Sequence, residues 1–166
     1  CFCGNTNPTA LYIIENNLDR LDISCWRKLC ENLNAIKLVE QNLDKLDKQC
    51  WENLCRNPNA IHLLEKNQDK IDWYWHLLSQ NVGAISIIEK NLDKIDWSFL
   101  SANPSAIKIL ENNPDKIDWC FLSANPNAIH LLEDNQDKIG WSLLSRNPNA
   151  IHLLEANRDK IYWNWL

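Results

Sequence analysis

The chain has 166 residues, of which 45% are hydrophobic and 23% are charged, and this composition excludes a disordered chain and predicts a sizeable core. Seventeen Lys and Arg residues stand against twenty-two Asp and Glu residues, so the net charge is −5. Without a basic surface for phosphate groups or anionic lipids, we expect neither nucleic-acid nor membrane binding. No apolar run is long enough for a membrane span and no signal-peptide pattern opens the chain, so we expect an intracellular protein.

A motif of 22 to 25 residues recurs about seven times along the chain. Its glutamates are Glu15, Glu40, Glu65, Glu89, Glu111, Glu133 and Glu155. The longer copies carry short insertions before a Trp, namely Ile23-Ser24-Cys25, Lys48-Gln49-Cys50 and Trp73-Tyr74. Because every other position keeps its phase, we expect each insertion in a loop or at a helix start.

The first half of each copy is predicted to be a helix of about ten residues. In the copy at residues 103–124, Asn103 is a good N-cap and the following Pro suits a first helical turn. Apolar residues within 106–110 share one face of a helical period, whereas Lys108 points to solvent. Asn113 is expected to end the helix, because Asn tolerates a left-handed conformation and a Pro follows it.

The second half of each copy is predicted to be a shorter helix. Asp118 is a suitable N-cap, with Ile117 and Leu122 at the spacing of a hydrophobic staple. Trp119 and Leu122 lie three residues apart and can both face the first helix.

A helix pair this small cannot bury its own apolar face, so neighbouring copies must stack. The sequence therefore predicts an all-α fold, an open α-solenoid of about seven short helix pairs in one array over residues 1–166, cut within a repeat at both ends. The alternative is a leucine-rich-repeat-like solenoid, whose period overlaps with this one. The pattern favours helices, because the segment before each Asn lacks the alternation of a strand.

Residues 125–133 (NPNAIHLLE) and 137–145 (DKIGWSLLS) resemble the repeats of uncharacterised proteins of giant DNA viruses. The resemblance covers nearly the whole chain. It implies a helical repeat array and a viral source, with the host cytoplasm or the virion as location, but no particular activity.

Charged columns recur once per repeat, and we expect a structural role for them. Seven equivalent groups titrate almost alike, whereas catalysis needs groups with distinct pKa values. The aspartates that precede the column of basic residues are expected to close the turn between helices by accepting backbone N–H bonds. No phosphate-binding loop or nucleophile motif occurs, so we expect a protein that is not an enzyme and needs no cofactor.

Trp and Cys columns are also interpreted as structural. The Trp column is expected in the core, with a Leu three residues after each Trp; its members are Trp26, Trp51, Trp75, Trp97, Trp119, Trp141 and Trp163. Four thiols could in principle meet one zinc ion: Cys25, Cys30, Cys50 and Cys55. We expect no metal there, because equivalent positions of stacked repeats lie about 10 Å apart.

One column on the exposed side of the first helices varies between copies, and such positions are where solenoids bind ligands. Its members, the candidate partner-binding residues, are Lys37, His62, Ser86, Lys108, His130 and His152. The sequence thus favours a non-enzymatic scaffold that binds another protein of unknown identity. The alternative is a structural spacer or virion component that self-associates through exposed repeat ends.

Overall fold

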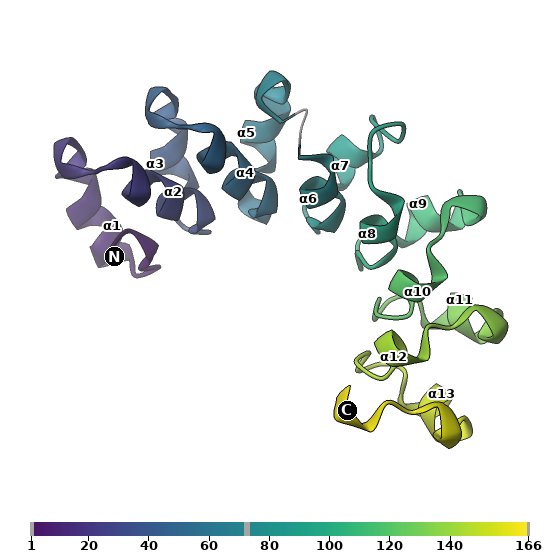
Figure 1. The fold of residues 1–166 in the computed structure, drawn as a ribbon. Helices are drawn as coiled ribbons and strands as arrows, with labels where there is room; N and C mark the ends of the chain where they lie inside the picture. The colour runs from purple at the N-terminus through teal and green to yellow at the C-terminus, as the bar shows by residue number, and fades with distance from the viewer. Residues whose placement is uncertain (1, 72–73, 166) are drawn as a thin grey trace. The chain divides into compact units, whose positions relative to one another are not determined.

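The computed structural model describes residues 2–71 and 74–165, which divide into two compact units, Cys1–Lys90 and Asn91–Leu166 (Figure 1). All regular structure in these residues is helical, as predicted. The leucine-rich-repeat alternative needs a strand in each repeat, and it is wrong for the described residues because they contain none. No helix among them is both long and apolar enough to cross a membrane.

In the first unit each repeat consists of a first helix, a 3-10 turn and a second helix. The first helices are α1 (Pro8–Glu15), α3 (Ile36–Glu40), α5 (Ile61–Lys66) and α7 (Ile85–Ile88). The second helices are α2 (Ile23–Glu31), α4 (Lys48–Arg56) and α6 (Trp75–Gln80). The 3-10 segments are η1 (Phe2–Gly4), η2 (Leu18–Arg20), η3 (Leu43–Lys45), η4 (Pro58–Ala60) and η5 (Gln68–Lys70). Helix α2 packs against η1 and α4, and α4 packs against α6.

The second unit repeats this order. Its second helices are α8 (Trp97–Ser101), α10 (Trp119–Leu122) and α12 (Trp141–Leu144), and its first helices are α9 (Ile107–Glu111), α11 (Ile129–Glu133) and α13 (Ile151–Ala156). The 3-10 segments are η6 (Pro114–Lys116), η7 (Gln136–Lys138), η8 (Arg158–Lys160) and η9 (Trp163–Trp165). Helix α10 packs against both α8 and α12, so like elements lie side by side within the unit (Figure 1).

The first helices are shorter than the predicted ten residues. Helix α9 begins only at Ile107, because the residues before it form a separate turn in which the Ala106 N–H bonds the Asn103 carbonyl. Helix α1 comes closest to the prediction, with Asn7 as its N-cap and Pro8 in its first turn. Helix α9 ends at Glu111 with Asn112 as its C-cap, and Asn113 precedes η6 with φ −136°, so the left-handed conformation expected at Asn113 is wrong.

The second helices α2, α4, α8 and α10 begin with an aspartate cap as predicted, whereas α6 and α12 have no side-chain cap. The Asp22 and Asp47 carboxylates accept hydrogen bonds from the N–H groups of Cys25 and Cys50, both at 2.9 Å. The first two insertions are therefore the opening turns of α2 and α4, and Asp118 caps α10 in the same way. In the third insertion Trp73 lies outside the described residues.

The apolar core follows the Leu column more closely than the Trp column. The described leucines three residues after each Trp are fully buried; they are Leu29, Leu54, Leu78, Leu100, Leu122 and Leu144. Trp26 and Trp51 are also buried, at 4% and 7% exposure. The later tryptophans are half-buried or, for Trp163, 70% exposed, so a wholly buried Trp column is wrong. These indoles lie at the start of short helices, and a Lys of the next repeat lies over two of them, Trp119 and Trp141.

Buried asparagines join successive repeats. The Asn125 side-chain nitrogen donates to the carbonyls of Ser101 and Asn103, each at 2.9 Å, and its oxygen accepts the Asn127 N–H at 3.0 Å. In the first unit Asn57 donates to the Cys30 carbonyl at 2.9 Å in the equivalent way. These amides pair with the backbone of the preceding repeat and so stabilise the stacking of repeats.

Candidate protein-binding surface

The predicted partner-binding residues lie one on each first helix after α1, and the side chains of all six are exposed. They are Lys37 on α3, His62 on α5, Ser86 on α7, Lys108 on α9, His130 on α11 and His152 on α13. The expected solvent-facing stripe is therefore present on each unit.

Four members of this stripe contact a glutamate of the preceding repeat. The ring nitrogens of His130 and His152 lie 3.0 and 2.7 Å from the carboxylates of Glu111 and Glu133, respectively. His62 approaches Glu40 at 3.4 Å, and the Ser86 hydroxyl donates to Glu65 at 2.8 Å. Hydrogen bonds from Lys66 and His62 lower the pKa of Glu40, so that carboxylate stays ionised. The stripe thus links repeats as well as facing solvent.

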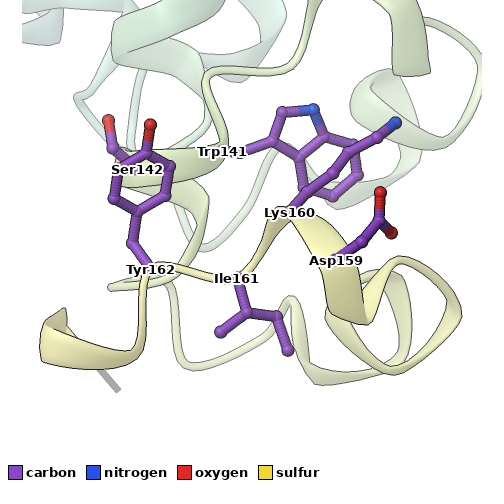
Figure 2. Close-up of a pocket in the computed structure, with 6 residues that line it drawn as sticks. All are labelled: Trp141, Ser142, Asp159, Lys160, Ile161 and Tyr162. Atoms are coloured by element: carbon purple, nitrogen blue, oxygen red, sulfur yellow. The ribbon is translucent and has the colours of Figure 1, made fainter.

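A groove forms where the Trp of one repeat meets the 3-10 turn of the next. Its lining includes Trp141 and Ser142 of α12, Asp159 and Lys160 of η8, and Tyr162, around about 420 Å³. Figure 2 shows the Lys160 side chain lying across the Trp141 indole, with Tyr162 on the Ser142 side. The Lys160 ammonium lies 4.5 Å from the ring centroid, within the range of a cation–π contact. We call this feature the Trp–Lys groove.

The same groove occurs in the first unit. A cavity of about 400 Å³ is lined there by Trp51 of α4, by Asp69 and Lys70 of η5, and by Tyr74. These four residues match Trp141, Asp159, Lys160 and Tyr162, whereas the rest of the lining differs, with Leu46, Asp47 and Lys48 in the first unit and Ser142 and Ile161 in the second. Within the second unit, Lys138 also lies 4.4 Å from the centroid of Trp119, one repeat before Trp141. The Trp–Lys contact therefore recurs in two successive repeats of the second unit.

The Asp and Lys columns line this groove, and the aspartates do not close the turns. Lys45 and Lys70 form ion pairs with the exposed carboxylates of Asp44 and Asp69, at 2.8 and 3.0 Å. The turn around η3 is held instead by the Asn42 carbonyl, which accepts the Lys45 N–H at 3.1 Å. The expected role of the Asp column is wrong at these positions, because the backbone N–H already has a carbonyl partner.

The four cysteines considered for zinc do not converge. Besides burial, Cys50 raises the pKa of Cys30 and Cys25 raises the pKa of Cys3, so the thiols interact as separate pairs and not as one group of four. No group of three or more His, Cys, Asp or Glu residues in the described part of the chain is arranged to hold a metal ion.

The stripe was predicted from the sequence but the Trp–Lys groove was not, although each of its residue types recurs in the sequence. The Trp was interpreted as core and the Lys as part of a charge ladder, so the two columns were not joined across a repeat boundary.

Comparisons with family models, curated proteins and solved structures find no match for this chain.

Proposed function

We propose that this chain is a non-enzymatic scaffold, built as an open solenoid, that binds an extended segment of another protein along its Trp–Lys grooves. The observation that carries this proposal is the occurrence in both units of a groove lined by a Trp, an Asp, a Lys and a Tyr at equivalent positions of the repeat. A site formed once serves one ligand group, whereas a site repeated with the fold serves a ligand that is itself linear or repetitive. The predicted viral source stays a prediction.

The spacing of packed helices narrows the class of ligand. Neighbouring helices lie about 8 to 10 Å apart, and a polyproline II segment advances about 9 Å per three-residue turn. Such a segment can present an equivalent side chain to successive grooves. Aromatic-lined grooves are the usual docking sites for this conformation, and the Asp and Lys rims can accept and donate its polar bonds. Affinity then comes from modest contacts summed over repeats.

Affinity capture with charge-matched variants tests this proposal. The groove variant carries Lys70→Glu and Lys160→Glu, and the control carries Lys37→Glu and Lys108→Glu on the stripe, so each unit changes by the same charge. Circular dichroism confirms that each variant is folded. We expect a protein retained by the parent chain and the control to be lost from the groove variant. Retention of the same proteins by all three chains contradicts binding in the grooves, and loss from the control alone moves the site to the stripe.

The structural alternative has an observation of its own. Apolar side chains are exposed together at the last repeat, where Ile151, Tyr162, Trp163 and Trp165 are 49 to 70% exposed. A self-associating spacer would use such a surface. Analytical ultracentrifugation of the parent chain and of Trp163→Ser/Trp165→Ser distinguishes the two functions. Concentration-dependent association that the double variant abolishes favours the spacer, and a monomer in both cases favours the scaffold.

A further inference from the structure

Two positions, the first of them buried, face each other across successive repeat boundaries. One lies two residues before the asparagine that joins repeats, and the other lies directly before the Trp of the next second helix. In the second unit the Ser101 hydroxyl accepts the Asp118 N–H at 3.0 Å, and the Ser123 hydroxyl accepts the Gly140 N–H at 2.9 Å. We call these the facing positions.

In the first unit, cysteines occupy both facing positions at two consecutive boundaries. Besides burial, Cys25 raises the pKa of Cys3, and Cys50 raises the pKa of Cys30, so the thiols interact in these two pairs. Their segments are in contact, since α2 packs against both η1 and α4. All four are free thiols, and all but the half-buried Cys25 are buried. A pairing that recurs at equivalent positions is set by the repeat, not by one chance contact.

We propose that Cys3–Cys25 and Cys30–Cys50 are sites of reversible disulfide formation, each closed by exchange with a small-molecule disulfide. One protein thiolate attacks that disulfide, forms a mixed disulfide and releases one small thiol. The facing thiolate then attacks the protein sulfur of the mixed disulfide and releases the second small thiol. The two protons of the protein thiols end on the two released thiols, so the small disulfide is reduced as the protein is oxidised.

Burial sets the order in which the two pairs react. Cys25 is the more accessible member of its pair and is the point of entry. Burial raises the pKa of Cys3 to about 12, so this thiol attacks only when the mixed disulfide on Cys25 holds a sulfur beside it. Cys30 and Cys50 are both fully buried, and burial raises the pKa of each thiol. Their reaction requires α2 and α4 to separate locally, so the Cys30–Cys50 pair reacts more slowly.

The two disulfide bonds would link successive repeats of the first unit covalently. Each closes a loop of about 20 residues, and by the chain-entropy relation a loop of that size lowers the unfolded population about 250-fold. The first unit therefore becomes more resistant to unfolding in an oxidising environment, while the second unit is unchanged.

The chain supplies its own controls. Cys55 occupies the same position as Cys30 and is equally buried, but Tyr74 stands at the facing position. Cys120 is exposed on α10. Neither cysteine should enter an intramolecular disulfide.

Peptide mapping after oxidation tests the proposal. The full chain carries Cys1→Ser, because residues 1 and 3 share a tryptic peptide, and is incubated with oxidised glutathione without denaturant. Free thiols are alkylated, and digestion with trypsin and a glutamate-specific protease separates Cys50 from Cys55 at Glu52. We expect a Cys3–Cys25 peptide first and a Cys30–Cys50 peptide later. Both should vanish on reduction, and Cys50→Ser should remove only the second.

Three results would overturn the proposal: persistent glutathione adducts on Cys25 without linkage to Cys3, linkage of Cys30 to Cys55, or complete alkylation of all four thiols after prolonged oxidation. A urea titration gives an independent readout. Oxidation should raise the unfolding midpoint of the parent chain, and Cys25→Ser/Cys50→Ser should remove the shift. An equal shift in that variant would contradict stabilisation by the two disulfide bonds.

Discussion

Replacing Asn125 by Ala removes one of the buried asparagines that join repeats. Its amide nitrogen loses two bonds, to the carbonyls of Ser101 and Asn103, and its oxygen loses the bond from the Asn127 N–H. The side chain is fully buried, so no water replaces these partners freely. At about 1 kcal/mol of net stability for each hydrogen bond, the expected loss is about 3 kcal/mol.

Urea unfolding followed by Trp fluorescence measures this loss. With an m-value of about 1.5 kcal/mol/M, the midpoint of the second unit should fall by about 2 M. The matched control is Asn127→Ala, which removes one exposed bond to the Pro104 carbonyl and should cost below about 1 kcal/mol. Equal losses in the two variants, or a loss below about 1 kcal/mol for Asn125→Ala, would refute the assignment of repeat stacking to the buried amides.

Other substitutions test the fold elsewhere. Gly83→Ala should lower the thermal unfolding midpoint of the first unit, because a Cβ there would lie 2.8 Å from a backbone carbonyl oxygen, whereas Gly4→Ala meets nothing within 4 Å and should be neutral by calorimetry. Ser123→Ala should cost about 1 to 2 kcal/mol in urea unfolding, because its buried hydroxyl bonds two repeats at once. The Arg27 guanidinium lowers the pKa of Asp47 from 3.8 to about 2, so this pair contributes stability above about pH 4 that is lost as the pH falls through 2. Arg27→Gln should therefore lower the urea midpoint at pH 7, and the difference from the parent chain should vanish near pH 2.

The helical repeat could be predicted because its signals are local. A column of Leu three residues after Trp and an Asp before the second helix depend only on helical periodicity and capping. The fully buried Leu122 and the cap at Asp118 both confirm this reasoning. The single array over residues 1–166 stays a prediction.

The first helix and the groove could not be predicted from one repeat alone. The sequence of one repeat predicts Asn103 as a helix cap. An asparagine at this position also donates a hydrogen bond to the backbone of the preceding repeat, as the bonds of Asn125 show. When the asparagine is held in this pairing, the residues that follow it form a turn, and the first helix begins only after that turn. Similarly, Lys160 meets Trp141 only across a repeat boundary. Contacts of this kind become visible once the columns of successive repeats are placed side by side.

Site-specific photo-crosslinking tests the proposed function most directly. A photoreactive amino acid replaces Ser142, which lines the groove of the second unit, or the exposed Asp134, which lies outside it at the end of α11. Each chain is illuminated in the cells that produce it, and crosslinked peptides are identified by mass spectrometry. The account predicts that position 142, but not position 134, crosslinks to an extended segment of another protein. Equal crosslinking at both positions, or none at position 142, would contradict a scaffold that binds protein through its Trp–Lys grooves.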